Sequence, residues 1–75
     1  MRSDLITVDK EIMGGTPVFK GTRVPVQSLF DYLTHGHPLE EFLGDFPGVS
    51  RETALMVLDL AGRSFVGAAH ETAAG

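Results

Sequence analysis

Few side chains in this sequence have the type and spacing that metal binding or catalysis requires. His35 and His37 stand two positions apart and His70 lies near the end of the chain. A structural zinc site takes four ligands, and the chain has no cysteine to complete one. Glu41 and Asp45 are four residues apart, but no base or nucleophile accompanies them. We therefore expect no catalytic residue, no metal, no cofactor and no enzymatic activity.

Residues 15–22 have a superficial likeness to a phosphate-binding loop. That motif requires a glycine, four residues and then Gly-Lys followed by serine or threonine. Here Lys20 precedes Gly21, so the lysine is misplaced and we expect no nucleotide site. Lys20 and Arg23 nevertheless flank a glycine bend. They serve either as solubilising charge or as contacts to a phosphate or to a partner's carboxylate.

The elements that position these residues fall into two parts. Residues 1–25 are expected to form short strands and turns, with a strand over 5–8 and a small hairpin around Gly21. Residues 26–66 are expected to form a helical core. Residues 67–75 are small and weakly patterned, so we expect a flexible tail there.

The helical core should contain three helices. The first follows Pro25 and is capped near Gly36, and the second covers about residues 38–45. Ser50 is a favourable N-cap for the third. The second helix, the turn after it and the third helix have helix-turn-helix spacing, although an ordinary helical hairpin has the same spacing.

Apolar residues cover a wide arc of the third helix. At 100° per residue this arc spans about 220°, more than the ~100° stripe of a surface helix. The surplus is expected to face another chain. One face carries Ala54, Leu58, Ala61 and Phe65, the opposite face carries Glu52, Met56, Asp59 and Arg63, and one flank carries Val57 and Leu60.

Length and charge limit the classes of protein. The 75 residues allow a single domain, 1–75, whose small core favours oligomerisation. No apolar run is long enough for a membrane span or a signal peptide, so we expect a cytoplasmic protein. The net charge of −4 disfavours tight DNA binding by one chain and suits a basic protein partner equally well.

Residues 14–26, Gly-Gly-Thr-Pro-Val-Phe-Lys-Gly-Thr-Arg-Val-Pro-Val, resemble the signature of a bacterial and archaeal family named domain of unknown function 433. Its members typically read G-K-P-x-I-x-G-T-R-hydrophobic-P-V. The similarity extends over about residues 5–62. Thr16 stands where the family often has lysine, and Leu60 stands where it often has tyrosine. The lost lysine removes one candidate phosphate contact.

The resemblance implies a mainly α fold, in which short N-terminal strands precede a three-helix homeodomain-like or winged-helix-like core. It also implies a type II antitoxin of the VapB-like kind, because members often sit beside a PIN-like ribonuclease toxin. Such antitoxins dimerise, bind their operator DNA and neutralise the toxin. The alternative is a protein-interaction or dimerisation module that does not bind DNA.

These expectations assign two groups of residues. The cations that would contact operator DNA are Lys20, Arg23, Arg51 and Arg63. The apolar residues that would form the homodimer or toxin interface are Leu5, Ile6, Val8, Val57, Leu60 and Phe65. In the homodimer, the strand over residues 5–8 is expected to pair with its counterpart.

Overall fold

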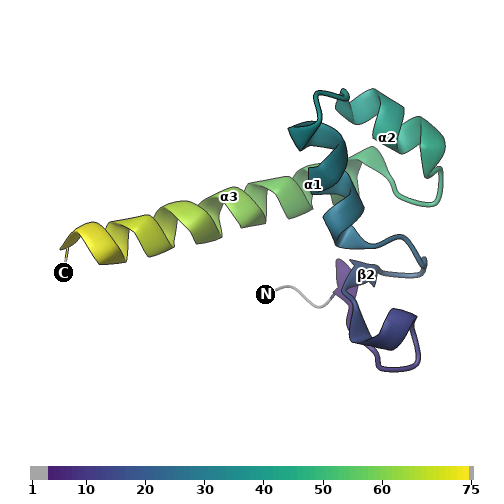
Figure 1. Cartoon of the computed structure of the whole chain (residues 1–75), viewed down its shortest axis with the longest axis horizontal. Helices are drawn as coiled ribbons and strands as arrows, with labels where there is room; N and C mark the ends of the chain where they lie inside the picture. Colours follow the sequence, from purple (N-terminus) through teal and green to yellow (C-terminus); the bar gives the residue numbers. More distant parts are fainter. Residues whose placement is uncertain (1–3, 75) are drawn as a thin grey trace.

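A short antiparallel sheet precedes three helices, and the last helix projects far beyond the rest of the molecule (Figure 1). The computed structural model describes residues 4–74, with side chains described for residues 4–71. The elements are β1 (Ile6–Thr7), the 3₁₀ turn η1 (Met13–Gly15), β2 (Val18–Phe19), α1 (Val26–Thr34), α2 (Leu39–Asp45) and α3 (Arg51–Ala74). The expected mainly helical chain with short N-terminal strands is confirmed. The finer homeodomain-like or winged-helix-like assignment stays a prediction.

The sheet consists of β1 and β2, with Ile6 opposite Phe19 and Thr7 opposite Val18. After β2 the chain turns back at Gly21, whose φ of 78° is in the left-handed region that favours glycine. The hydroxyl of Thr22 donates a hydrogen bond of 2.8 Å to the carbonyl of Phe19 and closes the turn. One edge of β1 is therefore occupied by β2 of the same chain, and pairing between two copies through the other edge stays a prediction.

All three helices begin close to where the sequence predicts, and the first two also end there. Gly36 follows α1 with a φ of 86°, and Ser50 caps α3 by accepting a hydrogen bond of 3.1 Å from the backbone N–H of Thr53. The expected flexible tail from residue 67 is corrected, because α3 continues through Ala74. The tail contains alanines and no proline, and extending an existing helix is far easier than nucleating a new one.

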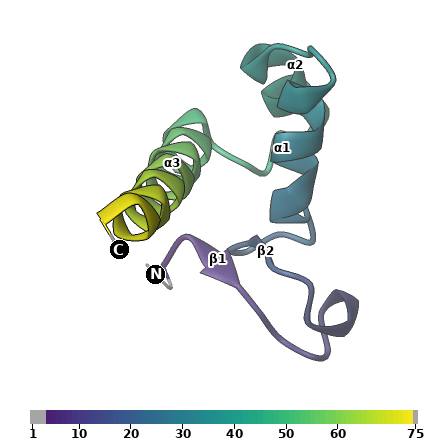
Figure 2. The ribbon, with the colours of Figure 1, turned by 60° about the vertical axis from the view of Figure 1, so that its left-hand side comes forward.

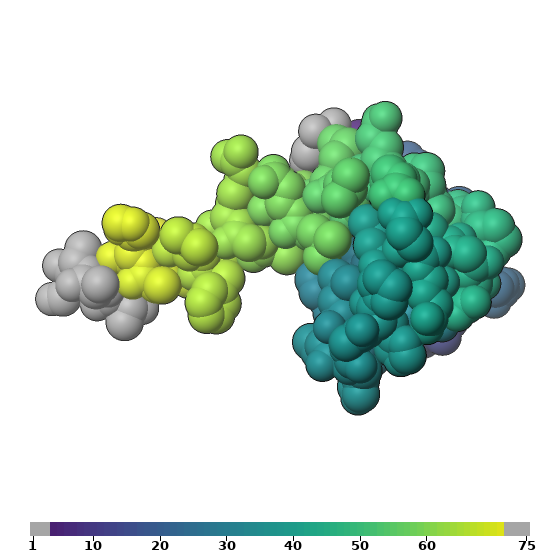
Figure 3. Space-filling model, turned by 90° about the horizontal axis from the view of Figure 1, so that it is seen from above, coloured from purple at the N-terminus to yellow at the C-terminus, as the bar shows by residue number. Residues whose placement is uncertain are grey.

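The core is formed by residues of the sheet, α1, α2 and the first half of α3, and Figure 2 shows the sheet near the start of α1 and α2 beyond its other end. Phe42 of α2 is fully buried, with its ring centroid 6.0 Å from that of Phe19, 5.4 Å from that of Tyr32 and 5.1 Å from that of Phe46. The other buried members of this cluster are Leu5, Leu29, Val49, Ala54 and Val57. Only the first half of α3 contributes to the core. Residues 62–74 of α3, which we call the arm, extend away from the core (Figure 3).

Candidate functional site on the projecting helix

The expected DNA-contacting cations lie on different elements. Lys20 and Arg23 are exposed around the turn after β2. Arg51 begins α3 and forms an ion pair with Glu40 of α2. Arg63 lies twelve residues after Arg51 on the same helix, which is about 18 Å along its axis. Its Nε donates a hydrogen bond of 2.9 Å to Asp59 Oδ2. The two helical cations are therefore already partnered by carboxylates within the chain.

The ion pair between Arg51 and Glu40 shifts the pKa of both groups. The hydrogen bond from the guanidinium lowers the pKa of Glu40, and the same hydrogen bond raises the pKa of Arg51. Both side chains are more than half exposed, so solvent screens the pair and its contribution to stability is small. While the pair is formed, the carboxylate of Glu40 offsets the positive charge of Arg51 at the start of α3.

The six apolar residues expected at an interface divide into two groups. Leu5 and Val57 belong to the chain's own core, at 6% and 8% exposure, so each leaves only a small part of its side chain for contact with another chain. Ile6 and Leu60 are half-buried and pack against that core. Val8 and Phe65 are exposed, at 62% and 76%. A helical wheel gives the angles between residues but not the direction of the core, which here lies between Ala54, at 0% exposure, and Val57.

An apolar groove of about 960 Å³ lies where the arm leaves the rest of the molecule. One wall is formed by Leu5 and Ile6 at β1 and by Val26 and Phe30 of α1. The other wall is the inner face of α3, which we define as Val57, Ala61, Ser64 and Ala68, flanked by Leu60 and Phe65. Apart from Arg63 at its edge, the lining carries no charged side chain among the described residues.

The opposite side of α3 also carries exposed apolar residues. We define this outer face as Leu55, Asp59, Gly62 and Val66, which fall within about 60° of one another on the helix. Leu55 is 48% exposed and Val66 is 56% exposed. A shallow hollow beside them is lined by Gly62, Val66 and neighbouring residues. Our sequence reasoning missed this face, although the spacing of seven and four residues from Leu55 to Gly62 to Val66 marks it.

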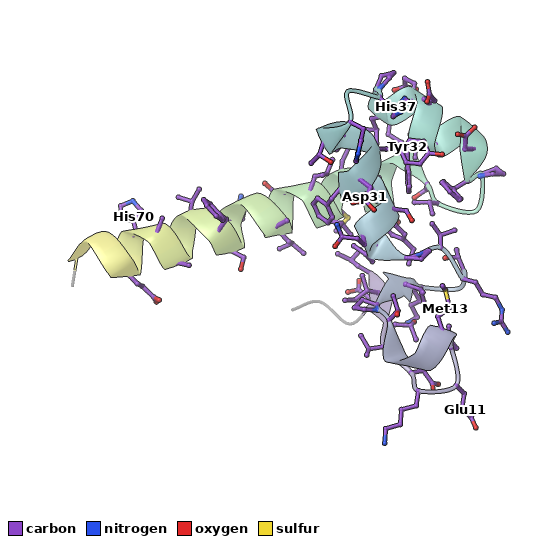
Figure 4. The ribbon with its side chains drawn as sticks, in the orientation of Figure 1. Glu11, Met13, Asp31, Tyr32, His37 and His70 are labelled. Atoms are coloured by element: carbon purple, nitrogen blue, oxygen red, sulfur yellow. The ribbon has the colours of Figure 1, made fainter. Side chains whose placement is uncertain are left out.

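Two polar side-chain pairs lie where α1 is followed by α2. Tyr32 donates a hydrogen bond of 2.7 Å to Asp45, and His37 Nδ1 lies 2.7 Å from Glu41 Oε2. Figure 4 places His70 on the arm, far from His37 and Tyr32. Within residues 4–74 no three histidine or carboxylate side chains are grouped so that they could hold a metal ion. The Tyr32–Asp45 pair therefore joins α1 to α2 at the surface, whereas the His37–Glu41 pair is local to the start of α2.

No helix in the described part of the chain is both long enough and apolar enough to cross a membrane.

Electrostatics and burial together indicate where a partner could bind. The projecting helix has two exposed faces with apolar residues, and the cations on it are paired. The candidate functional site is therefore the exposed apolar surface of α3.

Comparisons with known proteins identify the family. The model of the family described as "Protein of unknown function (DUF433)" matches residues 6–61, so the arm lies beyond the matched region. The protein y4eO of Sinorhizobium fredii, described as uncharacterized, is 39% identical over 49 residues, which are 65% of this chain and 22% of that protein. The chain thus spans about a fifth of the length of this curated relative.

A solved structure gives the same result. The crystal structure of a DUF433 member protein from Anabaena variabilis resembles this chain with a TM-score of 0.70 and 26% identity, over 93% of this chain and 69% of that one. The family match, the sequence similarity and the shared fold agree with one another. This chain belongs to the DUF433 family.

Proposed function

We propose that this chain functions by binding another protein through the outer face of α3, as the antitoxin of a type II toxin–antitoxin system. The partner is then a PIN-like ribonuclease toxin, which the chain holds in an inactive complex. The observation that carries the proposal is the exposure of Leu55 and Val66 on one side of a helix that extends beyond the core. The toxin class comes from the resemblance of residues 14–26 to a family whose members often accompany such toxins.

The outer face is unusual for a helix in contact with water. A surface helix normally places charged and polar residues on the side away from its core. Here Leu55 and Val66 occupy that side, about 16 Å apart along the axis, at 48% and 56% exposure. Complete burial of an apolar side chain of this kind against a partner contributes about 1.5–3 kcal/mol by removing it from water. Two such groups on one helical face are suited to a groove on a partner.

Charge supports a basic partner. The chain carries a net charge of −4, and Glu52 and Asp59 are exposed on or beside the outer face. A nuclease that binds RNA carries basic groups, and complementary charge accelerates encounter and favours the correct partner. Acidic groups beside two apolar anchors therefore suit a ribonuclease better than they suit DNA.

Operator DNA is less well supported as the main ligand. A recognition helix presents basic or amide groups to base edges, whereas the first turns of α3 present Glu52 and Leu55. Arg51 and Arg63 are already paired with carboxylates. Operator binding stays a secondary part of the proposal, carried by Lys20 and Arg23. The alternative function is a protein-interaction module whose partner is not a toxin.

Growth rescue tests the proposal. The product of the neighbouring reading frame is expressed alone and then together with this chain, which should restore growth and co-purify with the toxin. The double variant Leu55→Asp/Val66→Asp should lose both effects, because placing charges in an apolar interface costs about 3 kcal/mol or more, a weakening of at least ~100-fold.

A matched control is available in the same chain. Met13 is 48% exposed, as Leu55 is, but lies in η1 and outside α3. Aspartate tolerates the positive φ of 50° at this position, so Met13→Asp should remain folded and keep full rescue. The antitoxin role is wrong if the neighbouring product is harmless alone, or if it stays toxic beside soluble native chain. Equal rescue by the native chain and the double variant would show that the outer face is not part of the interface with the toxin.

A further inference from the structure

The chain exposes more surface than a compact protein of its mass. Its solvent-accessible area is 5242 Å², whereas a compact monomer of 8.1 kDa exposes about 4500 Å². Its radius of gyration is 13.6 Å, against about 11 Å for a compact domain of 75 residues. The excess of roughly 750 Å² is close to the ~800 Å² that each partner contributes to a standard protein interface.

The excess surface lies around the groove and the arm. Figure 2 looks nearly along α3 and shows β1 and α1 on the same side of it, where they form one wall of the groove. The arm continues the inner face of α3 past this wall through Ser64 and Ala68. Phe65 lies at the open end of the groove and is 76% exposed. Each chain therefore carries both an unfilled apolar groove and a projecting phenylalanine.

We propose that the groove is filled by the arm of a second copy of this chain, in a two-fold symmetric dimer whose α3 helices pack antiparallel along their inner faces. The arm of 13 residues is about 20 Å long, so it can extend along the partner's inner face toward β1 and α1. Phe65 of each protomer then covers the groove of the other. The contact is isologous, and both grooves are filled at once.

The side chains at the contact fit this occupant. Ala61, Ser64 and Ala68 are small, which allows the two helix axes to approach closely. Among the described residues the lining contains no carboxylate, and its one cation, Arg63, is 76% exposed and paired with Asp59, so two chains of net charge −4 can meet here without burying carboxylates against each other. The outer face with Leu55 and Val66 points away from this contact. The dimer therefore uses a surface different from the one proposed for the toxin.

Sedimentation of the full chain tests the dimer. At tens of micromolar the native chain should sediment at twice 8.1 kDa. Phe65→Asp should raise the dissociation constant at least ~100-fold without loss of helical circular dichroism, since Phe65 is exposed in the single chain. Val66→Asp, the adjacent substitution on the outer face, should remain dimeric. A monomeric native chain, or equal weakening by both variants, would overturn the proposal.

The absence of cysteine allows the geometry to be tested directly. We place the two-fold axis midway between Ala61 and Ser64. Residue 64 of one protomer is then about 5 Å from residue 64 of the other along the helix axes, and the corresponding distance for residue 68 is about 16 Å. Ser64→Cys should therefore form a disulfide-linked dimer on mild oxidation, and Ala68→Cys should not, because disulfides join Cα atoms up to ~7 Å apart. Equal cross-linking of both variants would indicate parallel helices and refute the antiparallel dimer. Loss of toxin binding with the dimer intact would refute only the antitoxin role.

Discussion

Replacement of Phe42 by alanine is the most informative single test of how this small domain is held together. Phe42 is fully buried, and its ring packs against those of Phe19 of β2, Tyr32 of α1 and Phe46 at the end of α2. It is therefore the residue through which the sheet and the first two helices contact one another. In Phe42→Ala all three aromatic neighbours lose a partner at once.

The size of the effect follows from burial and from the length of the chain. A fully buried phenylalanine replaced by alanine costs about 3–5 kcal/mol, and each aromatic pair contributes about 0.5–1.5 kcal/mol beyond its buried area. The three pairs are part of that measured cost, so we expect a decrease of about 4 kcal/mol, the middle of the range, in the free energy of unfolding. A domain of 75 residues has a total of only about 4–11 kcal/mol. Phe42→Ala should therefore be at the edge of unfolding at room temperature.

Urea unfolding followed by circular dichroism measures the loss. The matched control is Phe65→Ala, the same substitution at a side chain that is 76% exposed. At concentrations where the chain is monomeric, this control should change the free energy of unfolding by less than ~0.5 kcal/mol. At higher concentrations its stability should fall below that of the native chain, because dimerisation stabilises only the native protein. A loss below about 1.5 kcal/mol in Phe42→Ala would show that the core is not centred on this ring.

Two further predictions concern the junctions between helices. Tyr32 donates to Asp45, and this hydrogen bond raises the pKa of Tyr32 above its ordinary value of 10.0. The fold thus favours the neutral phenol, so its contribution to stability is complete below pH 10.0 and is lost as the pH rises through the raised pKa. The pKa can be measured from tyrosinate absorbance, because Tyr32 is the only tyrosine of the chain. Tyr32→Phe should lack this part of the loss of stability at alkaline pH. An ordinary pKa for Tyr32 would contradict the hydrogen bond. Ser50→Ala should lower the free energy of unfolding in urea by about 1 kcal/mol. Ser50→Thr should lower it much less, because threonine, like serine, has a hydroxyl group that can cap α3. Equal losses in the two variants would exclude a capping role.

The sequence predicted the order and approximate bounds of the elements well, because local preferences set them. Pro25 precedes α1, Gly36 follows it, and Ser50 caps α3, each through an interaction within a few residues. The signature over residues 14–26 predicted the family, and the match over residues 6–61 confirmed it. The end of α3 was wrongly predicted, because weak patterning was taken as absence of helix although the alanines there favour it.

The sequence by itself determined that one helix carries more apolar surface than its own small domain needs. Only the tertiary structure decided which residues of that helix are buried, because this depends on the direction from which β1, α1 and α2 approach it. Val57 faces them and belongs to the core, whereas Phe65, two turns further along, lies where the helix has passed beyond them. The pairing of Arg51 with Glu40 has the same origin, since it joins two helices across a turn. Angular spacing along a helix is local, but the position of its neighbours is set by the packing of the whole chain.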